Sequence, residues 1–183
     1  MIIPVISWVF FFLQEIPGQS LPILGLVDDF LLYDTQAKEF HLRHLKDKIF
    51  VTDFIFTTCS GICPTLSQNM VNLYRAYQNN DNVRFVSISV NPEYDSPQIL
   101  ADYARRYNAD TTKWHFLTGA REKIQSLAVH SFKICSIEEP IFHSGYFVLV
   151  DRKAQIRGYY DGTKPYETTK LIQDIALLLK EKR

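Results

Sequence analysis

A chain of 183 residues is long enough for one domain with a core of its own, so its folding need not depend on disulfides. Its 20 basic and 20 acidic side chains cancel to a formal net charge of zero, and the absence of a basic stripe argues against nucleic acid as a partner. Three cysteines are too few for a secreted disulfide scaffold. Because two of them lie close together, a redox or metal site is the better interpretation.

The N-terminal run 1–13, MIIPVISWVFFFL, is apolar apart from Ser7. A membrane-spanning helix needs about 20 apolar residues. A secretory signal carries early basic residues, whereas the first basic residue here is Lys38. The run is therefore either a buried tail or an atypical export signal or membrane anchor, and we favour the second interpretation. We predict an apolar segment with its linker over residues 1–20 and a folded domain over residues 21–183.

Strand and helix signals alternate along the predicted domain. Strands are predicted over residues 29–33, 49–56, 83–90, 114–117, 145–150 and 155–160. Helices are predicted over residues 64–77, 97–107 and 122–129 and from residue 165 onward. The alternation favours parallel central strands with helices on both faces, and the last two strands form a hairpin that adds antiparallel ones. The predicted fold class is α/β, a central mixed sheet flanked by helices, and it is compatible with a thioredoxin-like domain.

The most informative motif is a pair of cysteines, Cys59 and Cys63, at the junction between a buried strand and a helix. At the start of a helix, the unpaired N–H groups and the helix dipole stabilise negative charge, and the thiolate is the form that binds metal or exchanges disulfides. Residues before proline avoid helical geometry, so Pro64 is expected to hold Cys63 at the helix cap. Gly61 is expected to let the loop fold back tightly. Both sulfurs can then point toward one spot.

Two thiolates form a soft site that favours Cu(I), with zinc as a competitor, and such a site usually needs a third ligand. His41 and His44 are predicted to lie in a solvated surface turn. We expect His115 to pack within a strand and His130 to end a short helix. We interpret Cys135 as a small buried side chain, with a third thiol near the loop of His143 as the alternative.

His143 differs from the other histidines because it immediately precedes the hairpin strand that begins near Gly145. In thioredoxin-like folds, the loop that enters this strand faces the cysteine loop across the site, an argument by fold analogy. His143 is therefore the favoured third ligand.

These residues carry a family resemblance. Phe54-Ile55-Phe56-Thr57-Thr58-Cys59-x-x-x-Cys63-Pro64, Val86-Ser87-Ile88-Ser89-Val90-Asn91-Pro92-Glu93, Asp95-Ser96-Pro97 and Trp114-His115-Phe116-Leu117-Thr118-Gly119 resemble segments of the Sco/SenC family, the copper chaperones for cytochrome c oxidase assembly. The match spans roughly residues 21–180. There are two departures: Phe142 stands where the family often has an aspartate before the histidine, and Asn91 where an aspartate commonly precedes Pro-Glu. The first removes a carboxylate that could tune the site.

The resemblance implies a thioredoxin-like fold and a site that binds copper, as Cu(I) or Cu(II), through Cys59, Cys63 and His143. It implies as partners a cytochrome c oxidase subunit that carries a copper site and other copper chaperones. It also implies a location outside the cytoplasm, in the bacterial periplasm or the mitochondrial intermembrane space, which fits membrane anchoring through residues 1–13.

Two functions stay open on the same cysteine pair. The first is a copper-binding metallochaperone, a binding protein rather than a catalyst. The second is a thiol–disulfide oxidoreductase, in which Cys59 and Cys63 are the catalytic pair and reduce cysteines of a copper-receiving partner. Peroxide reduction ranks lower, because nothing in the sequence places Arg75 or Arg84 beside Cys59. A purely stabilising disulfide ranks lowest, since so short a loop gives little entropic stabilisation.

Overall fold

The central strand of the molecule, β4 (Ile49–Ile55), is buried along its whole length, as its apolar sequence predicts. The computed structural model describes residues 20–135 and 145–181. The other strands of the six-stranded sheet are β1 (Gly25–Leu26), β5 (Val83–Ser89), β6 (Trp114–Leu117), β7 (Tyr146–Val150) and β8 (Gln155–Asp161). Their order is β1-β8-β7-β4-β5-β6.

The sheet combines parallel and antiparallel pairs. β4 runs parallel to β5, and β5 runs parallel to β6. On its other side β4 is antiparallel to β7, which forms the predicted hairpin with β8. The prediction of a central mixed sheet flanked by helices is therefore confirmed.

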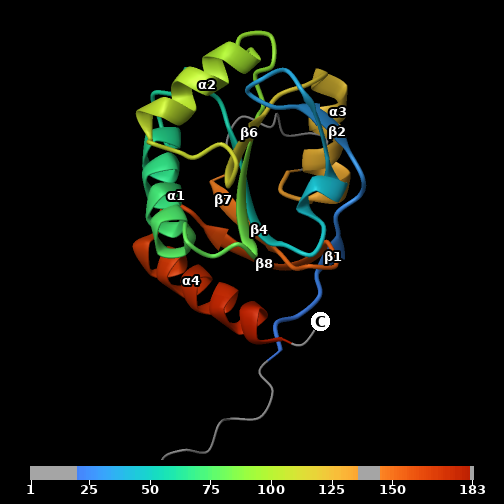
Figure 1. Cartoon of the computed structure of the whole chain (residues 1–183), viewed down its shortest axis with the longest axis vertical. Coiled ribbons are helices and arrows are strands. Elements are labelled where there is room, and N and C mark those ends of the chain that lie inside the picture. Colours follow the sequence, from blue (N-terminus) through green and yellow to red (C-terminus); the bar gives the residue numbers. More distant parts are fainter. Residues whose placement is uncertain (1–19, 136–144, 182–183) are drawn as a thin grey trace, which may run out of the picture.

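Helices cover both faces of this sheet (Figure 1). On one face lie α1 (Cys63–Tyr77), α2 (Pro97–Arg106) and α4 (Pro165–Lys180). On the other lie α3 (Arg121–Ser126), the wider turn η3 (Leu127–Ser131) and a hairpin of β2 (Leu31–Tyr33) and β3 (Glu39–His41), followed by the short helix η2 (Leu42–Leu45).

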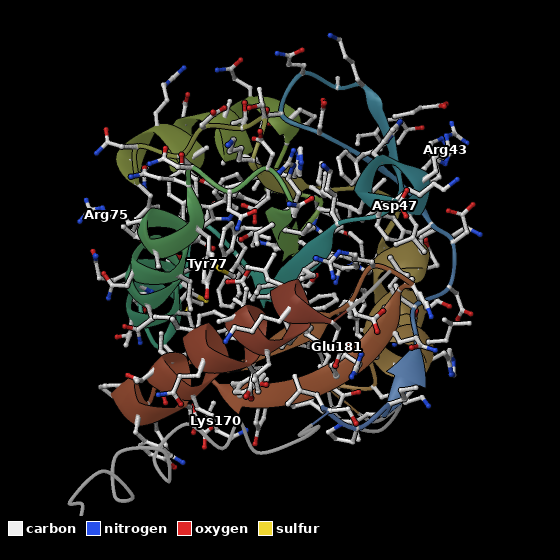
Figure 2. The ribbon with its side chains drawn as sticks, turned by 60° about the horizontal axis from the view of Figure 1, so that its bottom comes forward. Arg43, Asp47, Arg75, Tyr77, Lys170 and Glu181 are labelled. Atoms are coloured by element: carbon white, nitrogen blue, oxygen red, sulfur yellow. The ribbon has the colours of Figure 1, made fainter. Side chains whose placement is uncertain are left out.

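The neighbouring helices α1 and α4 are joined by a hydrogen bond. The hydroxyl of Tyr77 donates to the carbonyl of Ile172 at 2.7 Å. Figure 2 shows Tyr77 above α4, which crosses the front of that view. This hydrogen bond ties α1 to α4 on their shared face of the sheet.

The sheet separates two apolar cores, and the alternation of strand side chains decides which residue enters which core. Val51 and Ile55 belong to the core under α1, α2 and α4. Phe50 and Phe54 belong to the core on the α3 side. Asp53 lies on the same face of β4 as Val51 and Ile55, so its side chain projects toward the face that α1 covers.

Two sequence predictions on the α3 side need correction. The strand predicted over 29–33 begins at Leu31 and pairs with β3 in a separate hairpin, so it is not part of the central sheet. The sequence does not predict β3, because the turn before it contains no glycine to signal a hairpin. In place of a glycine, Asp34 accepts the N–H groups of Gln36 and Lys38, and Ala37 adopts the left-handed conformation at φ 58°. His41, predicted to lie in a surface turn, is the last residue of that strand.

The predicted apolar segment over residues 1–20 lies outside the described residues except for Ser20, so its role stays a prediction. Within residues 20–135 and 145–181, no helix is long and apolar enough to cross a membrane.

Candidate metal and thiol site

The cysteine loop, residues 56–63, connects the carboxyl end of β4 to α1. Cys59 lies in the loop and is partly exposed, whereas Cys63 is buried with 4% of its surface accessible. The backbone N–H of Cys59 donates to the carbonyl of Phe56 at 3.2 Å, which closes a turn directly after the strand. The two thiols are thus held at the edge of the sheet where β4 ends.

Cys63 is the first helical residue, and Ile62 is the cap, so the helix begins one residue earlier than predicted. The N–H of Leu66 donates to the carbonyl of Ile62 at 3.0 Å and closes the first turn. Pro64 is tolerated as the second helical residue, because the N–H that it lacks would have no partner there. The expectation that Pro64 holds Cys63 outside the helix is wrong, since burial of the Cys63 side chain outweighs that local preference.

The structure brings the two sulfurs together, as the sequence predicts. Partial burial alone would raise the pKa of Cys59. The Cys63 thiol and the backbone N–H groups of Cys63, Gly61 and Ile62 all donate to the Cys59 sulfur, and together they lower its pKa below the ordinary value. Cys59 is therefore the thiol that ionises first.

Cys63 behaves in the opposite way. Burial, the hydrogen bond that it gives to Cys59 and the nearby charges of Cys59 and Asp53 raise the pKa of Cys63 to about 12, although a backbone hydrogen bond from Phe56 acts against them. The pair thus consists of a partly exposed thiol whose pKa is lowered, Cys59, and a buried thiol that donates a hydrogen bond to it, Cys63. This asymmetry suits both soft-metal binding and stepwise thiol exchange.

Gly61 does not have the role predicted for it. Its φ is not in the left-handed region, and a Cβ at this position would lie 3.8 Å from the Cys59 sulfur, an ordinary contact. The fold-back of the loop therefore comes from the Phe56–Cys59 turn and the N–H groups around the sulfur, not from a requirement for glycine.

A buried carboxyl group lies behind the cysteine pair. Asp53 is fully buried on the sheet face that α1 covers, and the Ser87 hydroxyl donates to its Oδ1 at 2.6 Å. Burial raises the pKa of Asp53 to about 7, although the hydrogen bonds from Ser87 and its own backbone lower it in part. Sequence reasoning missed this residue. An acidic side chain inside an otherwise apolar strand was the available signal.

A second buried carboxyl group, Asp95, holds the first part of the cysteine loop. Both its oxygens accept hydrogen bonds from Thr57, which lies two residues before Cys59. In the sequence, Asp95 is visible only as part of a family motif. Its contact with Thr57 could not be predicted, because the two residues are 38 positions apart in the chain.

The chain that enters β7 lies against the cysteine loop. A Cβ at Gly145 would lie 3.5 Å from the Ile62 side chain, and the carbonyl of Gly145 accepts the N–H of Gly162 at 2.7 Å. His143, two residues before Gly145, lies outside the described residues, so its role as a ligand stays a prediction. Phe142 lies outside them as well.

The other candidate ligands are placed elsewhere. His41 ends β3, and His44 follows it in η2. The His115 ring packs on Phe40 with centroids 4.7 Å apart, which agrees with its predicted packing role. His130 is exposed in η3. No group of three or more His, Cys, Asp or Glu side chains within residues 20–135 and 145–181 is arranged to hold a metal ion.

Cys135 is partly buried and packs against the core on the α3 side, in agreement with its interpretation as a small packed side chain. It ends the described segment that precedes residue 145. The alternative of a third thiol at the site concerns a loop outside the described residues and stays a prediction.

Comparison with known proteins agrees with the resemblance seen in the motifs. The family model described as SCO1/SenC matches residues 24–180. A SCO1 protein homolog of Bacillus subtilis is 31% identical over 175 residues, which cover 91% of this chain and 91% of that protein.

Two solved structures have a similar fold. The structure of BsSco, described as a member of the Sco family of cytochrome c oxidase assembly proteins with a disulfide switch, is 30% identical and has a TM-score of 0.79. The match covers 90% of this chain and 100% of the BsSco chain. A SCO1/SenC family lipoprotein from Bacillus anthracis is 28% identical with a TM-score of 0.78, over 88% of this chain and 100% of that one.

Proposed function

Because the chain belongs to the SCO1/SenC family, we propose that it is a copper chaperone that assists assembly of the copper site of cytochrome c oxidase. It binds one copper ion as cargo through Cys59, Cys63 and His143. One observation carries the proposal: the two cysteine sulfurs converge at the start of α1, where N–H groups stabilise the thiolate of Cys59. Family membership indicates the target protein, and the types of ligand atoms indicate the metal.

Copper fits the donors that the chain offers. Two sulfurs and one imidazole form a soft to borderline set, which suits Cu(I) and also allows Cu(II). Three protein ligands leave the ion accessible to a ligand from a partner, as transfer by ligand exchange requires. Zinc, which prefers four ligands in structural sites, fits such a three-ligand set less well.

The position of Gly145 supports His143 as the third ligand. Gly145 lies beside Ile62 of the cysteine loop, and only one residue separates it from His143 in the chain. Because an extended chain spans at most about 3.6 Å per residue, this short separation is compatible with His143 as the third ligand.

Metal analysis of the reduced protein tests the proposal. Wild type is expected to bind one Cu(I) per chain in competition with a chromophoric chelator, and Cys59→Ser and His143→Ala are expected to bind more weakly. The matched controls are Cys135→Ser and His130→Ala, which change the same residue types away from the cysteine loop. If Cys59→Ser and His143→Ala keep the stoichiometry and affinity of wild type, the assignment of the site is wrong.

The asymmetry of the thiols favours a second function, reduction of a disulfide in a copper-receiving protein. The Cys59 thiolate attacks one sulfur of the partner disulfide and releases the other as a thiolate, which takes up a proton. Cys63, once deprotonated, attacks the Cys59 sulfur of the mixed disulfide. The partner leaves as a dithiol, and Cys59 and Cys63 are oxidised to a disulfide.

The exchange is tested with a disulfide-containing peptide as substrate. Wild type is expected to reduce the peptide in the presence of an external reductant, and Cys63→Ser is expected to accumulate a mixed disulfide through Cys59. Cys59→Ser, which lacks the attacking thiolate, serves as the control. Absence of a mixed disulfide with Cys63→Ser would exclude this second function and leave copper binding unaffected.

The protein acts outside the cytoplasm at a membrane surface, where a respiratory oxidase receives its copper. The relative from Bacillus anthracis is described as a lipoprotein, which supports membrane anchoring, and residues 1–13 are the candidate anchor. The partners are then an oxidase subunit with a copper site and other copper chaperones. Fractionation of cells that produce the full chain tests this location, because release of the protein by salt alone would argue against an anchor.

A further inference from the structure

The buried side chain of Asp95 joins two loops at the edge of the sheet where the cysteine pair lies. Asp95 is 0% exposed and ends the turn Asn91–Asp95, which follows β5. Its Oδ2 accepts the backbone N–H of Thr57 at 3.1 Å, and its Oδ1 accepts the Thr57 hydroxyl at 2.5 Å. The Ser89 hydroxyl, at the end of β5, also donates to Oδ2, at 2.6 Å.

The turn that carries Asp95 is itself held by hydrogen bonds. The N–H groups of Tyr94 and Asp95 both donate to the carbonyl of Asn91, at 3.0 and 2.9 Å. The N–H of Asn91 donates to the Ser89 hydroxyl at 3.1 Å, and Ser96 next to Asp95 caps α2. These hydrogen bonds hold the Asp95 carboxyl group in a fixed position between the end of β5 and the start of α2.

Thr57 connects Asp95 to the cysteine loop. It follows Phe56, whose carbonyl accepts the N–H of Cys59. A hydrogen bond from Phe56 also reaches the Cys63 sulfur. Because Thr57 lies between Phe56 and Cys59, movement of Thr57 would displace the turn that aims the Cys59 sulfur at the N–H groups of Gly61 and Ile62.

We infer that Asp95 is a positioning residue for the cysteine pair, since it ties the Thr57 backbone and hydroxyl to the end of β5. This inference rests on the proposed function, because it assigns to Asp95 the alignment of the thiols that bind copper or exchange disulfides. Asp95 does not touch the metal or the substrate in this role. It acts only through Thr57.

The most direct test removes one hydrogen bond and leaves the rest of the fold intact. Thr57→Val takes away the hydroxyl that donates to Asp95. The matched control, Thr58→Val, makes the same change one residue closer to Cys59, at an exposed position. Both variants are made in a Cys135→Ser background, so that alkylation by iodoacetamide reports on the pair.

The measurement is the pH profile of alkylation of the reduced protein without copper, together with the melting temperature. Thr57→Val is expected to slow alkylation at neutral pH by about fivefold and to shift the profile to higher pH, because loss of one hydrogen bond of about 1 kcal/mol loosens the turn. Thr58→Val is expected to match the background. If Thr57→Val also matches the background, or lowers only the melting temperature, the inference is overturned.

Two variants of Asp95 give a second test. Asp95→Ala removes all three hydrogen bonds, and Asp95→Asn keeps an acceptor for the N–H of Thr57 in the same shape. Partial recovery of the alkylation profile by Asp95→Asn relative to Asp95→Ala supports a positioning role, and equal profiles argue against it. If Asp95→Ala does not fold, the Thr57→Val profile decides.

The same experiments separate this inference from the proposed function. Alkylation is measured without metal, so a wild-type protein that binds no copper would refute the copper chaperone and leave the alkylation comparison valid. A wild type that binds copper while Thr57→Val alkylates as the background does would refute the role of Asp95 alone.

Discussion

The cysteine loop and the histidine turn, which we define as His41, His44 and His115 around Phe40, both gather side chains of metal-binding type. In the cysteine loop, the Cys59 sulfur lies beside the Cys63 thiol and is partly open to solvent. In the histidine turn, Nδ1 of His44 accepts the backbone N–H of His41 at 3.0 Å. This hydrogen bond engages the Nδ1 lone pair of His44 within the turn itself.

The comparison shows that residue type alone does not make a metal site. The His115 ring lies against Phe40, and burial with the nearby positive charge of Arg84 lowers the pKa of His115 to about 4. His115 therefore has a packing role, and the ring of His44 also lies against Phe40 with centroids 5.2 Å apart. A metal site requires lone pairs that are available and directed at a common point, and the hydrogen bond at His44 and the packing of His115 use these rings for other contacts.

The largest expected effect tests this contrast directly. Cys63→Ser is expected to lower Cu(I) affinity by more than about a hundredfold, because loss of a ligand exceeds the 10- to 100-fold effect of losing a supporting contact. The double variant His41→Ala/His44→Ala is expected to change the affinity by less than about twofold. Chelator competition on both proteins measures the two affinities, and equal losses would break the distinction between the two regions.

Asp53, behind the cysteine loop, is expected to make folding less favourable as pH rises. Its folded pKa of about 7 exceeds its ordinary value of 3.8, so between these values the folded state keeps a proton that the unfolded state has released. The stabilisation is complete below about pH 4 and is lost as pH rises to about 7, by at most about 4 kcal/mol. Asp53→Asn is expected to remove this loss.

Urea unfolding of the reduced, copper-free protein at pH 4, 6 and 8 measures the effect. The difference in unfolding free energy between Asp53→Asn and wild type should grow in favour of the variant from pH 4 to pH 8. A difference that stays constant over this range would show that Asp53 titrates normally in the folded state.

His115, in the histidine turn, is expected to give the opposite slope. Its folded pKa of about 4 lies below its ordinary value of 6.5, so the unfolded state takes up a proton first as pH falls. The contribution is complete above about pH 6.5 and is lost as pH falls to about 4, by at most about 3 kcal/mol.

His115→Gln is expected to remove this acid-side loss in the same urea measurements. His130→Gln, a change at an exposed histidine, serves as the control and should leave the pH dependence of wild type unchanged. If both variants retain the wild-type slope below pH 6.5, the packing of His115 does not suppress its protonation.

The smallest expected effect concerns the glycine of the cysteine loop. Gly61→Ala is expected to change Cu(I) affinity by less than about twofold, since the added Cβ meets the Cys59 sulfur at an ordinary distance and no left-handed φ is required. The chelator competition used for Cys63→Ser measures this change. A loss comparable to that of Cys63→Ser would mean that the loop needs the conformational freedom of glycine after all.

Several elements could be predicted from local pattern because their signals act over a few residues. β6 has the bounds predicted for it, Trp114–Leu117, and Ser96 caps α2, with the N–H of Ile99 directed at its hydroxyl at 3.4 Å. β1 could not be predicted, because two residues become a strand only by pairing with β8. The helix predicted over 122–129 widens at Leu127 into η3, which apolar spacing does not reveal.

The order of residues along the chain is enough to place two thiols at a strand-to-helix junction and to limit their chemistry to metal binding or thiol exchange. Folding is what distinguishes the two thiols: Cys59 meets the N–H groups at the start of α1, and Cys63 is buried near Asp53. Folding also brings Asp95 to the cysteine loop from a position 38 residues away in the chain. Local preferences act between neighbours in sequence, whereas burial and these hydrogen bonds exist only after the chain has folded.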